Sequence, residues 1–575
     1  MFRMRSLVFS APPLPRAAVA AVLSAILVAG AARAQDGVSG PYLAARLAMG
    51  QSDFPAASEA LARAIPADPA NLQLIDAAVS AALGEGDIAR ASEIARSLRA
   101  AGAFSQPAAL AIFADDLMRA DYPALRTALG SGGVAGPLGD GLLLGWIRVG
   151  EGDMAAAISA LEEAGRLQGA EVIAGYTLAL ARAAAGDFEA AHALLLGPAA
   201  PIVQDRRGVL LRVEILAQLD QTEAAIALID SSFDGPPDPQ IVALRAMLAA
   251  GEVPSYSFPQ DARTGIAEVF HTLSLALNDE QSRPLALAYG RIAVHLDPRH
   301  AHAALHVAGM LEDLGQWALA GEAYDGVAPE NPLYVAARIG KAGALVELGD
   351  DAAARAALTE LAQTHAAYAE VHVALADLLR RAEEYVGAAE AYGRAIAIIG
   401  PPLPRHWTLY YSRAIAYERA KMWDLAEPDF RLALQLSPDQ PMVLNYLGYS
   451  FLELGTNLDE AMTLIRRAVD QRPDSGHIVD SLAWGYFLLG EYEAALVPME
   501  RASLLMPVDP IVTDHLGDVY WAVGRKREAE FQWRRALSFD PEPELAERIR
   551  RKLEIGLDAT LAEEGEPSLA DRARR

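Results

Sequence analysis

The sequence predicts an all-α fold built as a solenoid of antiparallel helix pairs. Small residues recur about every 34 residues: a small residue or a proline stands 34 positions after each of Ala483, Ala495, Ala502 and Pro507. Hydrophobic residues make up 52% of the 575-residue chain but aromatic residues only 7%, so alanine supplies much of the apolar content. Because alanine loses no side-chain entropy in a helix and lets backbones approach, this composition favours closely packed helices.

Each copy of the repeat has the features that a helix pair requires. A small residue in the first helix faces an alanine in the second, so that the two helix axes can approach closely. Proline after the second helix stops it and can start the next helix. Glycine is predicted to end the first helix in a left-handed turn that other residues resist, at Gly315, Gly349, Gly455, Gly490 and Gly524.

This pattern resembles the tetratricopeptide repeat family, whose unit of about 34 residues is two antiparallel helices. The resemblance covers most of the chain, from weaker copies around Ala57 and Ala157 to the clear copies around Ala483 and Gly517. It implies a right-handed superhelix whose concave groove is lined by the first helix of each pair. The function that it implies is the binding of proteins or peptides in that groove.

Residues 1–34 are predicted to be a secretory signal peptide. Arg3, Arg5 and Arg16 precede an apolar run over residues 17–32, and a small-x-small cleavage pattern ends at Ala34. A permanent anchor is the alternative, but the run is shorter than the roughly 20 residues that a spanning helix needs. No later run is long enough. We therefore expect cleavage after Ala34 and a periplasmic protein, with peripheral attachment to the membrane or to an envelope complex as the alternative.

The rest of the chain divides into arrays and connections. Pro254 and Pro259 interrupt the repeat frame, and residues 400–404 lengthen a later connection. A charged helix after Pro541 is predicted to cover the apolar end of the array. The predicted boundaries are a degenerate N-terminal array at 35–251, a break at 252–264, a central array at 265–400, a proline-rich connection at 401–406, a C-terminal array at 407–541, a capping helix at 542–557 and a disordered tail at 558–575.

Charge and cysteine content narrow the classes of partner. The formal net charge is −26, and the predicted signal peptide holds arginines but no acid, so its removal makes the chain more acidic still. Such a surface repels phosphate backbones, which argues against nucleic acid as a partner. The chain has no cysteine. That excludes disulfides, thiolate metal sites and a lipid anchor on an N-terminal cysteine.

No catalytic motif with a specific spacing occurs in the sequence, which has no P-loop, G-x-S-x-G or H-E-x-x-H pattern. His295, His300, His302 and His306 do cluster, and the last two share a helix face, as metal ligands can. Without a cysteine or a glutamate at motif spacing, we expect solvent-facing or groove-facing histidines, with a metal site as the alternative. The chain is predicted to be no enzyme and to need no cofactor.

The family resemblance also implies which residues face the groove in the C-terminal copies. They are aromatic and acidic, which favours a partner with basic and apolar residues, because tyrosine and tryptophan bury much area for few rotatable bonds. The alternative is that Trp484 and Trp521 are packing residues and that the aspartates only solvate the surface. The predicted partner-binding residues are Asn445, Tyr449, His477, Asp480, Trp484, Asp514, His515, Asp518 and Trp521.

A finer resemblance concerns the segments DSLAWGYFLLG and DHLGDVYW, which are similar to bacterial envelope repeat proteins, many of them lipoproteins. One of these delivers substrates to a carboxyl-terminal processing protease. This chain lacks their anchoring cysteine. We expect a non-catalytic scaffold or adaptor in the cell envelope. A protease-adaptor role, or a part in envelope assembly or polysaccharide export, is the alternative.

Overall fold

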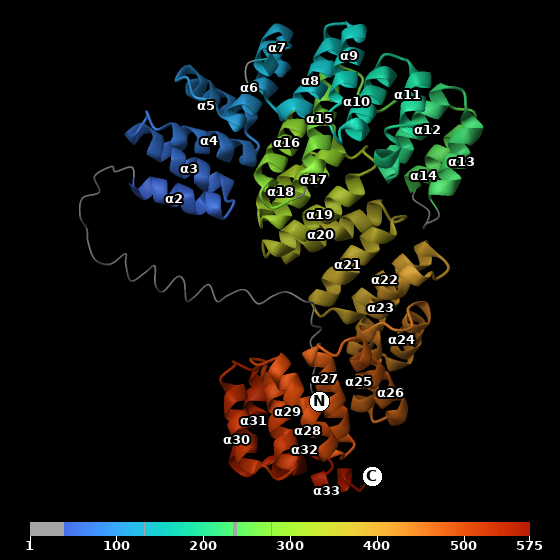
Figure 1. The fold of residues 1–575 in the computed structure, drawn as a ribbon. Helices are drawn as coiled ribbons and strands as arrows, with labels where there is room; N and C mark the ends of the chain where they lie inside the picture. Colours follow the sequence, from blue (N-terminus) through green and yellow to red (C-terminus); the bar gives the residue numbers. More distant parts are fainter. Residues whose placement is uncertain (1–38, 131–132, 234–238, 278, 575) are drawn as a thin grey trace. The chain divides into compact units, whose positions relative to one another are not determined.

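The computed structural model describes residues 39–130, 133–233, 239–277 and 279–574. The predicted signal peptide lies outside these residues. The described residues form α-helices joined by turns and short 3-10 segments, without a β-strand among them. Within each of the two compact units described below, most consecutive helices pack against each other as hairpins in chain order (Figure 1). The predicted all-α helical repeat fold is confirmed.

The described residues fall into two compact units, the first within 1–234 and 243–350 and the second within 235–242 and 351–575. The helices up to residue 350 are α2 (Ser39–Gly50), α3 (Phe54–Ala64), α4 (Leu72–Glu85), α5 (Ile88–Ala100), α6 (Gln106–Met118), α7 (Tyr122–Gly130), α8 (Gly136–Gly150), α9 (Met154–Ala164), α10 (Glu171–Ala184), α11 (Phe188–Leu196), α12 (Arg206–Gln218), α13 (Thr222–Ser232), α14 (Pro239–Ala249), α15 (Ala262–Ala276), α16 (Arg283–Leu296), α17 (Ala301–Asp313), α18 (Trp317–Asp325) and α19 (Tyr334–Glu347). The 3-10 segments η1 (Ile65–Ala67) and η2 (Ala200–Val203) join some of them.

The second unit continues the series of hairpins towards the C-terminus. Its helices are α20 (Asp351–Thr364), α21 (Ala369–Arg381), α22 (Tyr385–Ile399), α23 (Trp407–Arg419), α24 (Trp423–Leu436), α25 (Pro441–Leu454), α26 (Leu458–Gln471), α27 (Gly476–Leu488), α28 (Tyr492–Leu505), α29 (Pro510–Ala522), α30 (Lys526–Leu537), α31 (Pro543–Ile555), α32 (Leu557–Glu564) and α33 (Leu569–Arg572), with the 3-10 segment η3 (Pro404–His406) before α23.

The small residues of the repeat lie where neighbouring helices touch. Ala483, Ala495 and Ala529 are each 0% exposed. Gly517 on α29 faces Trp533 on α30 so closely that an added Cβ would overlap the indole ring. The five glycines predicted to end first helices all have positive φ angles, between 66° and 82° at four of them and 84° at Gly524. The predicted left-handed turn is therefore confirmed at these five glycines.

In the first unit, a capping aspartate follows the left-handed residue of several hairpin turns. Asp87 Oδ1 accepts a hydrogen bond from the Arg90 backbone N–H (3.0 Å) and so begins α5. Asp153 and Asp187 begin α9 and α11 in the same way. Such a cap satisfies one of the backbone donors that the first turn leaves without a partner. A left-handed residue followed by aspartate therefore marks the middle of these hairpins.

The first unit folds back on itself. Helices α15 and α16 pack against each other and also against earlier helices, α15 on α8 and α10, and α16 on α4 and α6 (Figure 1). Gly265 makes the approach of α15 possible, because an added Cβ there would overlap the ring of Trp146 on α8. Arg291 on α16 donates from Nε to the carbonyl of Gly84 at the end of α4 (3.1 Å). Helices far apart in sequence thus share one core.

The segment of the predicted break at 252–264 lies within the first compact unit. As the prolines predict, residues 252–260 are not helical, but they are packed. The Tyr256 ring lies 5.7 Å from that of Phe188, and the Arg207 guanidinium lies 4.9 Å from the centre of the Phe258 ring. The aromatic side chains hold this segment against α11 and α12, and both compact units are divided at residues 350 and 351.

The expectation of a disordered tail from residue 558 is wrong for the described residues. They form α32 and α33. Leu557 and Leu561 are 0% and 2% exposed and join the same core cluster as Trp533. Arg548 and Arg551 of α31 form ion pairs with Glu564 and Glu563 of α32. Apolar residues at helical spacing, together with this charge pairing, explain why the segment folds.

Candidate protein-binding groove

The nine predicted groove residues lie on the first helices of three successive hairpins. Asn445 and Tyr449 are on α25, the residues from His477 to Trp484 are on α27, and the residues from Asp514 to Trp521 are on α29. The structure brings several of them together, and they contact one another or other residues of this chain. The predicted surface is therefore partly occupied.

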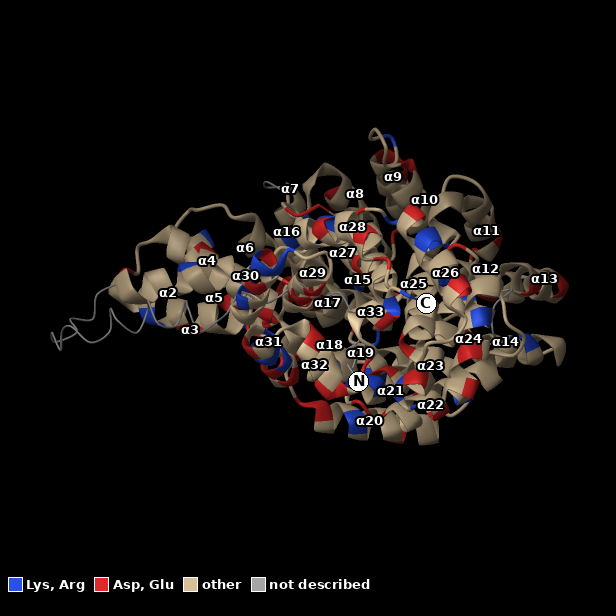
Figure 2. Ribbon diagram, turned by 90° about the horizontal axis from the view of Figure 1, so that it is seen from below, with Lys and Arg blue, Asp and Glu red and all other residues tan. Residues whose placement is uncertain are grey.

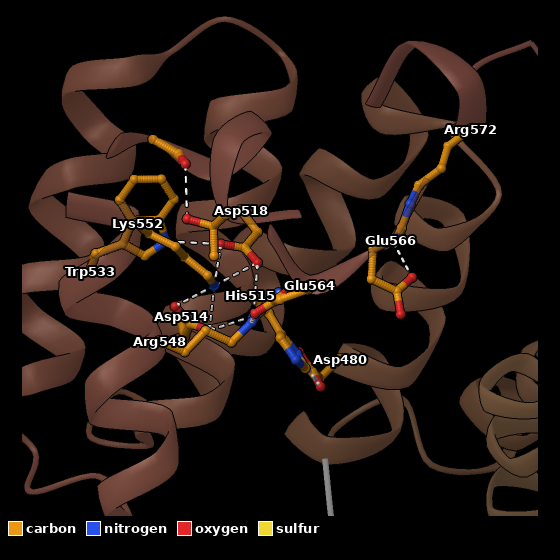
Figure 3. A network of polar contacts seen from close by, with 12 residues as sticks. Asp480, Asp514, His515, Asp518, Trp533, Arg548, Lys552, Glu564, Glu566 and Arg572 are labelled. Atoms are coloured by element: carbon orange, nitrogen blue, oxygen red, sulfur yellow. Dashed lines mark hydrogen bonds and ion pairs between the residues drawn. The ribbon is translucent and has the colours of Figure 1, made fainter. Parts of the chain in front are cut away.

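Asp514 and Asp518 hold a buried lysine and do not line an open groove. They are 1% and 0% exposed. Lys552 of α31, whose side chain is 0% exposed, lies between them, with Nζ 2.8 Å from Asp514 Oδ2 and 2.7 Å from Asp518 Oδ1 (Figure 3). Trp533 Nε1 also donates to Asp518 Oδ1 (2.9 Å). This corrects the prediction for both aspartates, because the capping helix covers them.

The charges in this cluster are matched. Arg548 adds a second cation, with Nη1 3.8 Å from Asp514 Oδ2 and 3.7 Å from Asp518 Oδ2. Burial raises the pKa of Asp514, and the positive charges of Lys552 and Arg548 oppose that rise. Two carboxylates and two cations share a site closed to water, and each one needs the others. The cluster joins α29 to α31 and belongs to the packing of the array.

Sequence analysis missed Arg548 and Lys552 as partners of these aspartates, although a signal for them exists. Arg548 stands 34 residues after Asp514, and Lys552 stands 34 residues after Asp518. Each pair is spaced by four residues, so each shares one helix face. A pair of bases one repeat after a pair of acids predicts contact between equivalent faces of adjacent hairpins.

Asp480, Trp484 and His515 form a second cluster one hairpin earlier. His515 Nδ1 lies 3.0 Å from Asp480 Oδ1, and the imidazole stacks on the Trp484 indole with ring centres 3.8 Å apart and an interplanar angle of 11°. Trp484 stacks on its other side against Phe487 at 4.6 Å. Burial on its own would lower the pKa of His515, but the carboxylate of Asp480 raises it overall. These three residues are half-buried or buried, and they contact one another.

Trp521 is covered by the C-terminal segment. Its Nε1 donates to Asp558 Oδ2 of α32 (2.8 Å), and Gly556 lies against its six-membered ring. Lys526 Nζ lies 4.5 Å from the centre of the indole. The alternative that Trp521 is a packing residue therefore describes its surroundings better than an open groove does.

Asn445, Tyr449 and His477 remain half-buried on α25 and α27. Burial raises the pKa of Tyr449 well above its ordinary value. Asn445 Oδ1 is buried without a hydrogen-bond partner among the described residues, and so are Nε and Nη2 of Arg419 at the end of α23. Sequence analysis did not single out Arg419. Arg419 Nε does lie 3.7 Å from Glu418 Oε2, and other described helices also hold buried polar atoms without hydrogen-bond partners. Because such atoms are uncommon in folded proteins, these two side chains give α23 and α25 unused hydrogen-bonding capacity.

The histidines considered as metal ligands belong to a buried network in the first unit. Glu268 of α15 accepts from Tyr176 Oη (2.8 Å) and from Arg207 Nη2 (2.6 Å), and its Oε2 lies 2.8 Å from His300 Nε2. His300 Nδ1 accepts from the Ala303 backbone N–H, so Nε2 carries the proton that Glu268 accepts. Within the described residues, no group of three or more potential ligands is arranged to hold a metal ion.

The remaining histidines of that cluster are held neutral. Burial lowers the pKa of His302 to about 3 and lowers the pKa of His271 well below its ordinary value. Burial also lowers the pKa of His306, whose Nε2 lies 3.0 Å from Ser274 Oγ. Ser274 donates its own proton to the Ala286 carbonyl (2.7 Å), so His306 must donate to Ser274. These side chains join α15 to α16 and α17.

Stacked helix hairpins with small residues at their contacts define a class of all-α repeat proteins. Residues 411–476 match the family model described as tetratricopeptide repeat. The chain therefore contains tetratricopeptide repeats over these residues. This fold supports a scaffold for protein–protein interaction. None of the described helices is both long enough and apolar enough to cross a membrane.

Several known proteins are similar to this chain. A TPR repeat-containing protein of Pseudomonas aeruginosa is 32% identical over 115 residues, which is 20% of this chain and 19% of that relative. The Cut9–Hcn1 hetero-tetramer of the APC/C is 14% identical over 91% of this chain and 97% of its own, with a TM-score of 0.37. Yeast Tom70 is 14% identical over 73% of this chain and 98% of its own, with a TM-score of 0.33.

Proposed function

We propose that the protein is a non-catalytic scaffold or adaptor of the bacterial cell envelope that binds a partner protein in the groove of its second unit. The observation that carries the proposal is the set of half-buried aromatic and polar side chains on α25 and α27, namely Asn445, Tyr449 and His477, in a fold whose hairpins stack side by side. Solenoids of this kind use their extended concave surfaces for binding.

The charge of the chain supports a partner with basic and apolar residues. The net charge is −26, and Lys and Arg are interspersed among acidic segments, as on α30 and α31 (Figure 2). Because Asp514, Asp518 and Trp521 contact α31 and α32, the proposed surface is confined to the helices before α29. The envelope location rests on the predicted signal peptide.

The test is affinity capture after cross-linking in cells that express the full chain with a C-terminal tag. One variant carries Asn445→Ala, Tyr449→Ala and His477→Ala. A matched control carries Asp424→Ala, Asp459→Ala and Asp470→Ala, three exposed residues on the second helices α24 and α26. We expect a defined envelope protein that the first variant loses and the control keeps, with unchanged helix content in both. Equal recovery from both variants would place binding elsewhere.

The protease-adaptor role is the narrower candidate, and it rests on the resemblance of DSLAWGYFLLG and DHLGDVYW to envelope repeat proteins. Adding the purified chain to a carboxyl-terminal processing protease should then speed cleavage of a substrate. The groove variant should lose this effect. A protease that works at the same rate with and without the chain would leave the general scaffold role alone.

A further inference from the structure

The last residues of the chain return to the turn between α27 and α28. We call residues 565–574 the strap. Tyr492 Oη donates a hydrogen bond to the Leu569 carbonyl (2.7 Å). The Arg572 guanidinium lies 5.6 Å from the centre of the Phe487 ring, and Arg572 is only 6% exposed. Figure 3 shows Arg572 beside Glu566. The strap thus lies two hairpins before its own position in the sequence.

The α27–α28 turn is shaped to receive this segment. Gly490 has a φ angle of 76° and lies so close to the strap that an added Cβ would overlap the Arg572 backbone. Gly524 occupies the equivalent turn 34 residues later, with a φ angle of 84°, and an added Cβ there would meet nothing within 4 Å. The same turn is therefore open in one hairpin and filled in the other. We call Phe487, Gly490 and Tyr492 the strap site.

The contacts in the strap site recognise a simple pattern. Tyr492 bonds a main-chain carbonyl, which every peptide offers. The Leu569 side chain packs against the core cluster that includes Phe487 and Tyr492. The arginine three residues later lies over the Phe487 ring, as cations prefer to lie over aromatic faces. A leucine followed three residues later by arginine therefore satisfies the site.

The strap is held by few contacts. Its first four residues, Gly565 to Ser568, connect α32 to α33, and α33 is only four residues long. Tyr492 bonds the Leu569 carbonyl. Apart from its contact with Phe487, Arg572 makes polar contacts with Glu566 Oε2 (3.2 Å) and with the Pro567 carbonyl (3.2 Å), both within the strap itself. A segment that makes the same two contacts from another chain can replace it.

We propose that the strap site binds a segment of a partner protein that forms one helical turn with a leucine and, three residues later, an arginine, as α33 does, and that the strap occupies the site in the free chain. Exposed Glu491 and Glu493 flank Tyr492 and favour a basic ligand. A second copy is the weaker choice of occupant. Its strap already has a site within its own chain, and two chains of net charge −26 repel each other. This site is separate from Asn445, Tyr449 and His477, so either proposal can fail alone.

The first experiment measures binding of a fluorescent peptide of residues 565–575 to the full chain. In one variant, Leu569→Ala and Arg572→Ala release the strap. When the strap occupies the site, the apparent affinity for the peptide is the intrinsic affinity multiplied by the fraction of chains whose site is open. We therefore expect the released chain to bind the peptide at least about tenfold more tightly than the unaltered chain. A peptide with Arg572→Ala should not bind. Equal affinity of the released and unaltered chains would overturn the proposal.

Matched glycine variants then locate the site. In the released chain, Gly490→Ala should abolish peptide binding, while Gly524→Ala, which has the same backbone strain but open space, should leave it unchanged. Equal effects of the two variants would overturn the assignment. Circular dichroism checks folding. If the released chain is not folded, hydrogen exchange in the unaltered chain decides: excess peptide should speed exchange in residues 567–573, and no change would count against the site. Dimers in light scattering that disappear on release would replace the partner with a second copy.

Discussion

The two units build their polar contacts over different distances along the chain. In the second unit, ion pairs join neighbouring hairpins: Arg431 pairs with Glu460, 29 residues away, and Lys552 pairs with Asp514, 38 residues away. In the first unit, Glu268 bonds Tyr176 over 92 residues, and Arg291 bonds Gly84 over 207 residues. The first unit closes on itself over several helices, whereas the second is a stack in which each hairpin contacts its neighbours and the strap reaches back from Leu569 to Tyr492, over 77 residues.

This difference bears on how each unit unfolds. When each repeat touches only the next, stability is a sum of local terms and the ends can open alone. When α15 packs on α8 and α10 and α16 packs on α4 and α6, no hairpin between them can open without breaking long-range contacts. We therefore expect cooperative unfolding in the first unit and gradual opening from the C-terminal end in the second.

The largest expected effect is that of Glu268→Gln in the first unit. Glu268 is 3% exposed and pairs with Arg207, whose side chain is 15% exposed. Removal of the negative charge leaves the guanidinium buried without a partner, which typically costs about 3–5 kcal/mol. Hydrogen exchange should show lost protection in α10, α12, α15 and α17 together. Glu223→Gln, an exposed change on α13, is the control and should have little effect. Loss confined to α15 would contradict the comparison.

Lys552→Met should have a large but local effect in the second unit. It leaves the two buried carboxylates of Asp514 and Asp518 with the more distant Arg548 as their cation and with the Trp533 hydrogen bond to Asp518. We therefore expect a loss of about 3 kcal/mol, the lower end for a broken buried pair. Protection should fall in α29 to α32 and stay unchanged in α21 to α25. Arg551→Met on the same helix removes only exposed ion pairs and serves as the control. A loss that reaches α25 would show that this unit is cooperative as well.

Gly265→Ala tests the close contact that closes the first unit. The added methyl group would overlap Trp146, and overpacking of this kind typically costs about 1–3 kcal/mol. Gly309→Ala on α17 meets nothing within 4 Å and should stabilise its helix by about 0.5–1 kcal/mol. The denaturant midpoint of the first unit, measured through hydrogen exchange in α8, should fall for Gly265→Ala and rise for Gly309→Ala. A gain in both variants would mean that α15 does not approach α8 so closely.

The sequence predicts the repeat, but it does not predict that the first unit folds back on itself. Period, buried alanines and turn glycines such as Gly490 are local features, and each predicts a contact within a hairpin or with the next one. In the sequence, nothing distinguishes Glu268 from other polar residues on helices. Its partner Arg207 lies 61 residues earlier, and no periodicity connects the two. Long-range pairing of this kind depends on how the whole unit packs, and a single sequence does not reveal it.

The candidate groove could be predicted in part for a related reason. The family positions place the nine residues on the first helices α25, α27 and α29, but they imply an open face at every hairpin. At the end of an array the cap supplies the next face, so Asp514 and Asp518 meet Lys552 instead of a partner. The apolar Leu557 and Leu561 in the supposed tail were the signal that the chain continues to fold.

The smallest expected effect is a pH dependence of stability that has opposite signs in the two units. In the first unit, burial lowers the pKa of His302 to about 3 and lowers the pKa values of His271 and His306. The unfolded chain then binds more protons than the folded unit as pH falls below about 6.5. Stability of the first unit should be complete above that pH and decline towards pH 3.

In the second unit the sign is opposite around His515, whose pKa is raised because Asp480 outweighs the effect of burial. Here the folded form binds the proton more tightly, so the contribution is complete below about pH 6.5 and is lost as pH rises through the folded pKa. Hydrogen exchange, corrected for intrinsic rates and compared between pH 5.5 and pH 8, should show protection rising with pH in α15 and falling with pH in α29. His515→Asn should abolish only the fall in α29. Parallel trends in both helices would mean that acid-sensitive carboxylates, rather than these histidines, set the pH dependence of both units.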